Sequence, residues 1–137
     1  MRRNVAETSG AGPEESAWGI ALWVPPADVA QTDEDVIVRI ELAGAAPGDV
    51  RVRATETELV VAGLRREPPG PRPRRIVRME IAFGPFERVI PLPAPVRPEA
   101  ATARLADGLL EVILPLADLP QPAPRGGIVV AIMLGGR

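Results

Sequence analysis

The stretch Ala103-Arg-Leu-Ala-Asp-Gly-Leu-Leu-Glu-Val-Ile-Leu-Pro115 decides the fold. Apolar residues recur at every second position on both sides of its Asp-Gly pair, at Ala103, Leu105, Leu110, Val112 and Leu114. Alternation of this kind is the pattern of a half-buried β-strand. Because Asp and Gly both tolerate positive φ, an Asp-Gly pair between two such runs predicts a tight antiparallel hairpin.

The same alternation recurs in other short segments of the chain, with prolines and glycines at the joints. No segment has a convincing apolar stripe of period 3.6, although Pro98–Ala106 could form a short helical turn. Many short strands at close spacing predict an all-β fold, an antiparallel immunoglobulin-like β-sandwich. The further alternating segments are Val36–Leu42, Val50–Ala54, Leu59–Val61, Val77–Phe83 and Phe86–Leu92.

Three regions follow from these patterns. Residues 1–23 form a short N-terminal arm that we expect to be flexible, and residues 24–117 form the sandwich. Residues 118–137 comprise a Pro/Gly linker and an apolar tail. The start of the chain lacks a secretory signal, and its longest apolar run, Ile128–Leu134, is far shorter than the roughly 20 residues of a membrane span. We therefore expect a cytoplasmic protein without a membrane partner.

The composition excludes most catalytic chemistry. The chain has no His, Cys or Tyr, and all 16 of its cationic side chains are arginines. Imidazole bases, thiol nucleophiles, zinc clusters, Schiff-base lysines and Ser-His-Asp triads are therefore ruled out. Carboxylates such as Glu41, Glu80 and Glu111 could in principle act as an acid/base pair, but nothing frames a cleft around them. We expect no enzyme, cofactor or metal.

One basic cluster stands out in a chain of formal net charge −2. We interpret it as a solvated loop and strand edge in preference to a phosphate site, because the overall charge is near balance and aromatic side chains are few. Nucleic acid is therefore not an expected partner. The cluster consists of Arg72, Arg74, Arg75 and Arg78.

Several stretches, in order along the chain, resemble the motifs of the small heat-shock protein family, which is built on the alpha-crystallin domain. The hairpin stretch Ala103–Pro115 matches the motif A-x-x-x-[ND]-G-[VL]-L-x-V-x-[LVI]-P at every specified place. The others are Trp23-Val-Pro-Pro-Ala-Asp-Val29, Val36-Ile-Val-Arg-Ile-Glu-Leu-Ala-Gly44, Asp49-Val-Arg-Val-Arg53, Leu59-Val-Val-Ala-Gly63, and Phe83-Gly-Pro-Phe-Glu-Arg88 followed by Leu92-Pro93.

The resemblance implies an ATP-independent holdase chaperone, which binds partly unfolded client proteins and prevents their aggregation under stress. It also implies a dimer that assembles into a larger homo-oligomer. An apolar arm segment would bind clients or pack in the oligomer, or alternatively would cover the edge of the sandwich. Its residues are Trp18, Ile20, Leu22 and Trp23.

The apolar tail is similar to the family's C-terminal I-x-[IV] motif, which implies docking in a groove on a neighbouring subunit. Spacing of two places both side chains on one face of an extended strand, and two registers are open, Ile128/Val130 and Val130/Ile132. The expected groove lies between the segments 50–54 and 101–105, although its alanines could also be ordinary core filling. The groove residues are Val50, Val52, Ala54, Ala101, Ala103 and Leu105.

The family's dimer contacts are carried over to a proline-rich loop and to the stretch after it. Four prolines between Arg65 and Arg75 cannot join a ladder, so a strand swapped with a partner is confined to about Arg74–Arg78. Arg88 matches a dimer-interface arginine, or else is an exposed strand residue. The predicted interface residues are Arg74, Arg75, Ile76 and Arg88.

One other class of function stays open at this point. A co-chaperone-like adaptor with a related β-sandwich would bind a folded partner protein instead of unfolded clients. The tail motif and the Asp-Gly hairpin favour the small heat-shock protein over the adaptor.

Overall fold

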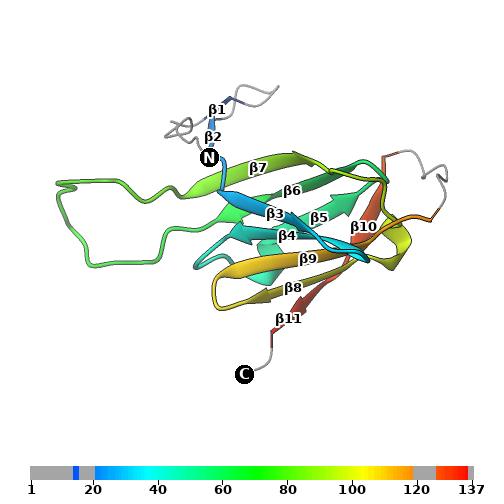
Figure 1. Ribbon diagram of the computed structural model, residues 1–137. Helices are drawn as coiled ribbons and strands as arrows, with labels where there is room; N and C mark the ends of the chain where they lie inside the picture. Colours follow the sequence, from blue (N-terminus) through cyan, green and yellow to red (C-terminus); the bar gives the residue numbers. More distant parts are fainter. Residues whose placement is uncertain (1–13, 16–20, 119–125, 136–137) are drawn as a thin grey trace.

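A computed structural model describes residues 14–15, 21–118 and 126–135 of the chain. Two β-sheets face each other and enclose one apolar core (Figure 1). The four-stranded sheet has the order β10-β5-β6-β7, and the five-stranded sheet has the order β11-β8-β9-β4-β3. The predicted all-β sandwich is confirmed.

The strands are short, and prolines or glycines lie at or near many of their ends. A small separate pair, β1 (Glu14–Glu15) and β2 (Ala21–Leu22), precedes the sandwich. The strands of the sandwich are β3 (Ala27–Gln31), β4 (Asp35–Glu41), β5 (Val50–Ala54), β6 (Glu58–Arg65), β7 (Gly84–Pro91), β8 (Thr102–Ala106), β9 (Leu109–Pro115), β10 (Ile128–Val130) and β11 (Ile132–Leu134).

The Asp-Gly hairpin forms as the alternation predicts. Strands β8 and β9 are antiparallel, with Leu105 opposite Leu110, and the two turn residues have φ values of 54° and 80°. Because β9 also pairs with β4 along its whole length, the hairpin lies at the centre of the five-stranded sheet. The helical turn predicted near residue 98 is a single 3-10 turn, Pro98–Ala100.

The core consists of the inward-facing side chains of both sheets. Val36, Val38 and Ile40 on β4 are fully buried, and so are Leu110, Val112 and Leu114 on β9 opposite them. Burial of one such aliphatic side chain stabilises the fold by about 1.5–3 kcal/mol. The alternation read from the sequence therefore marks the main source of folding free energy.

One predicted strand is absent, and three strands, β1, β2 and β3, were not predicted. The alternating run Val77–Phe83 lies in loop 66–83, which contains no strand and projects far beyond the sandwich (Figure 1). Its alternation was wrong as a strand signal, because it pairs with no other strand in the described part of the chain. Strand β3 escaped prediction because four of its five residues are exposed, so it shows no clean apolar period.

We predict that Leu110→Ala destabilises the fold by about 2–5 kcal/mol, since it leaves a cavity between the two sheets. The neighbouring Leu109 is a matched control, because it is 43% exposed whereas Leu110 is fully buried. Leu109→Ala should change stability by about 0.5 kcal/mol or less. Urea unfolding of both variants measures the difference, and equal losses would contradict this assignment of the core.

Candidate functional site

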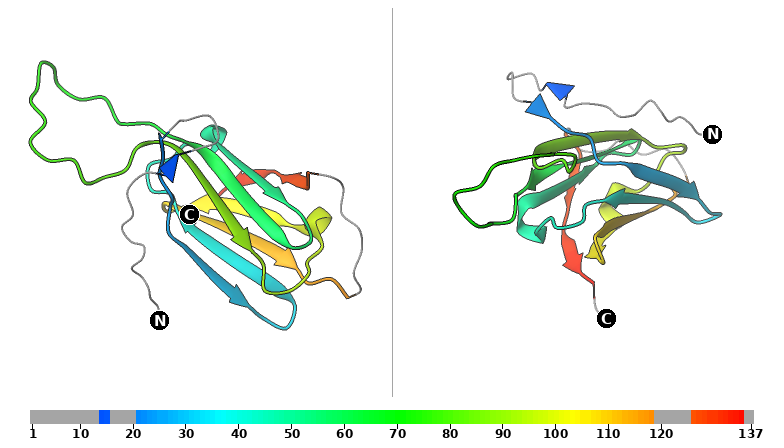
Figure 2. Two further views of the ribbon diagram at one scale, coloured as in Figure 1. Left: turned by 90° about the horizontal axis from the view of Figure 1, so that it is seen from above. Right: turned by 90° about the vertical axis from the view of Figure 1, so that its left-hand side faces the viewer.

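The tail segment, residues 126–135, lies against the sandwich of its own chain. Strand β10 runs antiparallel to β5, with Ile128 opposite Ala54, and β11 runs parallel to β8, with Ile132 opposite Ala103. The segment thus crosses from one sheet to the other and closes one side of the sandwich (Figure 2, right-hand view). The resemblance implied docking on a neighbouring subunit, whereas here the acceptor strands belong to the same chain.

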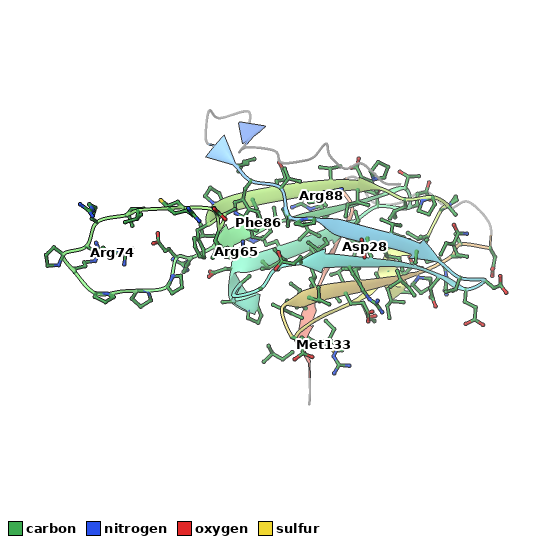
Figure 3. All side chains as sticks on the ribbon, turned by 60° about the vertical axis from the view of Figure 1, so that its left-hand side comes forward. Asp28, Arg65, Arg74, Phe86, Arg88 and Met133 are labelled. Atoms are coloured by element: carbon green, nitrogen blue, oxygen red, sulfur yellow. The ribbon has the colours of Figure 1, made fainter. Side chains whose placement is uncertain are left out.

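Neighbouring residues of the tail segment have opposite environments. Val130 is 7% exposed and joins the core cluster, and Ile132 packs against that cluster from the adjacent strand. Val129 is 70% exposed on the other face of β10, and Met133 lies outward on β11 (Figure 3). In this arrangement the pair Val130/Ile132 occupies the groove, while Ile128 is half-buried at its entrance.

The predicted groove residues all lie where the tail segment meets the sandwich. Five of them are buried in the core cluster, and the sixth, Ala101, is half-buried against it. They share this cluster with Val130 of the tail segment, so the tail extends the core over them. The five buried residues are Val50, Val52, Ala54, Ala103 and Leu105.

Glycines bracket the docked tail at both ends. Gly127 has φ +82°, and a Cβ on it would lie 2.6 Å from the carbonyl oxygen of Ala54. Gly135 donates its N–H to the carbonyl of Leu105 over 2.9 Å, and a Cβ there would collide with the Ala106 side chain. Larger residues would push the backbone away from β5 and β8, so the glycines permit the close approach.

We predict that Val130→Asp releases the tail segment, because a buried carboxylate without a partner costs several kcal/mol. Hydrogen exchange of the outer-edge amides of β5 should then accelerate by about tenfold or more, a loss of about 1.4 kcal/mol. Val129→Asp places the same charge on the adjacent, exposed position and should leave exchange unchanged. Equal exchange rates in the two variants would show that Val130 does not hold the tail.

The N-terminal segment, residues 21–26, closes the opposite side of the sandwich. Trp23 forms a bridge to Phe86 on β7, and their ring centroids are 5.4 Å apart. The chain then crosses to the five-stranded sheet, where it continues as β3. Trp23 therefore covers a sheet edge, and Leu22 lies half-buried in β2 beside it. Trp18 and Ile20 lie outside the described residues.

Loop 66–83 carries three of the predicted dimer residues, and all three are exposed. Arg74 pairs with Glu67 on the same loop at 2.8 Å, and Figure 3 shows it far from the sandwich. Arg75 and Ile76 follow it, with Ile76 51% exposed. Arg88, by contrast, lies on β7, and its Nη1 donates to the carbonyl of Pro25 at 3.2 Å. The structure does not bring Arg88 together with the other three.

Several charged side chains of the domain form ion pairs. Arg66, where the chain leaves β6, donates to both carboxylate oxygens of Asp49, and these hydrogen bonds hold the pKa of Asp49 below its ordinary value. The glutamates considered for acid/base chemistry have partners as well, and Glu41 accepts the N–H of Ala43 at 3.0 Å. Glu111 pairs with Arg39 and Glu80 with Arg78, each on a different part of the fold.

No group of three or more carboxylate, imidazole or thiol side chains in the described residues is arranged to hold a metal ion. No helix among them is both long and apolar enough to cross a bilayer.

The two-sheet sandwich, with its long loop and its edge-pairing tail, defines the alpha-crystallin class of domain. A sequence profile of the Hsp20/alpha crystallin family matches residues 28–132, and the chain belongs to that family. Members of the family are non-enzymatic chaperones.

Individual relatives agree with this assignment. The 17.3 kDa class II heat shock protein of Solanum peruvianum is 29% identical over 77% of this chain and 67% of its own length. For three curated relatives the matched part spans 60% to 67% of their own length. The crystal structure of hspA from Xanthomonas axonopodis superposes with a TM-score of 0.64 at 26% identity, covering 73% of this chain and all of that one. A small heat-shock protein from Xylella fastidiosa gives 0.62 at 25% identity, covering 76% and 95%.

Proposed function

We propose that this chain is an ATP-independent holdase of the cytoplasm, which binds partly unfolded proteins and keeps them from aggregating. One observation carries the proposal: a member of the Hsp20/alpha crystallin family exposes large apolar side chains in two separate segments. Val77, Met79 and Ile81 on loop 66–83 are 84%, 67% and 66% exposed, and Met133 and Leu134 of the tail are 58% and 74% exposed.

The physical basis is the complementarity between such segments and an unfolding protein. A partly unfolded client exposes apolar surface and unpaired strand edges, which are the features that drive aggregation. Exposed apolar patches on a folded protein mark interaction sites. We include Trp18, Ile20 and Leu22 of the arm in the client surface, although the first two lie outside the described residues.

We propose further that two copies pair through loop 66–83. The apolar residues of this loop alternate as in a strand but pair with no strand among the described residues. Strand β3 is the last strand of the five-stranded sheet, so its outer edge is free to accept another strand. In this arrangement the loop of one copy adds to β3 of the other. Arg74, Arg75 and Ile76 would lie at this contact.

The holdase activity is tested by light scattering of a heat-aggregating client in the absence of ATP. An equimolar amount of the purified chain should suppress the scattering, and added ATP should change nothing. An unrelated protein of similar mass is the control. An unchanged scattering trace would refute the holdase and favour the alternative, a co-chaperone-like adaptor that binds a folded partner.

We predict that Val77→Asp weakens pairing of two copies about tenfold or more, because it places a charge in the apolar contact. Arg78→Gln, at the adjacent exposed position, is the control and should have little effect, since surface ion pairs contribute about 1 kcal/mol or less. Sedimentation velocity over a range of concentrations measures the dimer dissociation constant. A constant equal to that of the unaltered chain in both variants would exclude pairing through the loop.

A further inference from the structure

Arg65 is the only buried charged residue in the part of the chain that the structure describes, with 6% of its surface exposed. It is the last residue of β6, at the point where the chain leaves the sandwich to form loop 66–83. Buried charges are costly unless they are paired or hydrogen-bonded, so this position calls for an explanation.

The guanidinium of Arg65 joins the two limbs of the loop at its base. Its Nε and Nη2 both donate to the carbonyl oxygen of Ala82, at 3.0 and 2.7 Å, on the limb that returns to the sandwich. Its Nη1 donates to the carbonyl of Ala43 at 3.0 Å. The nearest carboxylate oxygen, on Glu41, lies 3.9 Å away, beyond hydrogen-bond distance. Backbone carbonyls therefore satisfy this cation.

The face of the same guanidinium stacks on the N-terminal segment. Its central carbon lies 4.2 Å from the ring centroid of Trp23 and 5.6 Å from that of Phe83. The indole Nε1 of Trp23 donates in turn to the carbonyl of Gly84 at 3.1 Å. Arg65 and Trp23 thus hold two carbonyls that lie two residues apart, that of Ala82 at the end of the loop and that of Gly84 at the start of β7. We call this arrangement the Arg65 joint; it comprises Arg65, Trp23 and the carbonyls of Ala43, Ala82 and Gly84.

Besides the joint, the loop is fixed by surface ion pairs, Arg66–Asp49 at its base and Arg74–Glu67 and Arg78–Glu80 further out. Beyond the joint, residues 71–81 are all exposed and form no strand, and Figure 3 shows Arg65 and Phe86 at the base with Arg74 at the far end. A small rotation at the base moves the distant apolar residues by a large distance. A planar guanidinium can donate in its plane and stack on its face at once, whereas a lysine ammonium cannot.

We propose that the Arg65 joint is the positioning element that aims loop 66–83, and that its stack on Trp23 couples the N-terminal segment to the pairing of two copies. The inference rests on the proposed pairing through this loop. Displacement of the N-terminal segment would remove the ring from the guanidinium and loosen the loop. Arm movement and dimer stability are then linked through one stacked pair.

Two measurements on the full chain test the joint. The first is the dimer dissociation constant of Arg65→Lys, Trp23→Phe and the double variant, with Arg66→Lys as the control. Arg66 is adjacent to Arg65, but its side chain is 69% exposed. We expect Arg65→Lys to raise the constant about tenfold and Arg66→Lys to change it less than about twofold. In the double variant the dissociation constant should rise by less than the product of the two single fold-changes, because both residues act through one contact.

The second measurement reports the direction of the loop itself. The chain has no cysteine, so Arg72→Cys and Glu99→Cys introduce the only two sites for spin labels. The distance distribution between them, recorded in excess unlabelled chain of the same variant, should widen with Arg65→Lys and stay narrow with Arg66→Lys. An unchanged width together with an unchanged dissociation constant overturns the proposal.

The outcomes separate this inference from the proposed pairing. In one outcome, Val77→Asp weakens the dimer while Arg65→Lys changes neither the dissociation constant nor the width of the distance distribution. That result refutes the positioning role of the Arg65 joint and leaves the proposed pairing intact. If Val77→Asp has no effect, pairing through the loop fails, and the width of the distribution still decides whether Arg65 aims the loop. Should Arg65→Lys fail to fold, Trp23→Phe tests the joint, because it keeps an aromatic face and removes only the donor to Gly84.

Discussion

The apolar core between two stacked sheets must be shielded from water along both open sides of the sandwich, and the rest of this structure depends on that requirement. Each side is closed by a segment near one end of the chain that pairs first with one sheet and then with the other. Trp23 bridges β7 before the chain continues as β3, and the tail segment pairs with β5 as β10 and with β8 as β11. The core therefore extends into segments that a division into arm, domain and tail treats as accessories.

Alternation of apolar and polar residues predicted a strand correctly only where one face of that strand is buried in the core. The core strands have one buried face, so the spacing of Val36, Val38 and Ile40 on β4 predicted them directly, and the Asp-Gly turn set the hairpin register. The same alternation gave a wrong prediction at Val77–Phe83, where the apolar residues pair with no strand that the structure describes. It was silent at β3, an edge strand exposed at four of its five positions.

The candidate site divides in a similar way. The resemblance to the family implied the groove residues, and strand geometry required only a spacing of two in the tail. It left two registers open, Ile128/Val130 and Val130/Ile132. Which chain supplies the groove could not be identified, since local spacing carries no information about the path between residues 117 and 128. Arg65 also escaped notice: its role depends on the carbonyls of Ala43 and Ala82, which any residue type could present.

The tail segment, seated on its own chain, makes the groove a site with a tethered competitor. Segments joined covalently to their binding site through a short stretch of chain experience effective concentrations on the order of millimolar. A strand from any other molecule must compete with this effective concentration of the tail to pair with β5 and β8. A strand from outside would therefore need a higher concentration to occupy the groove than it would if the tail were absent, and the affinity of the tail for its own chain sets that concentration.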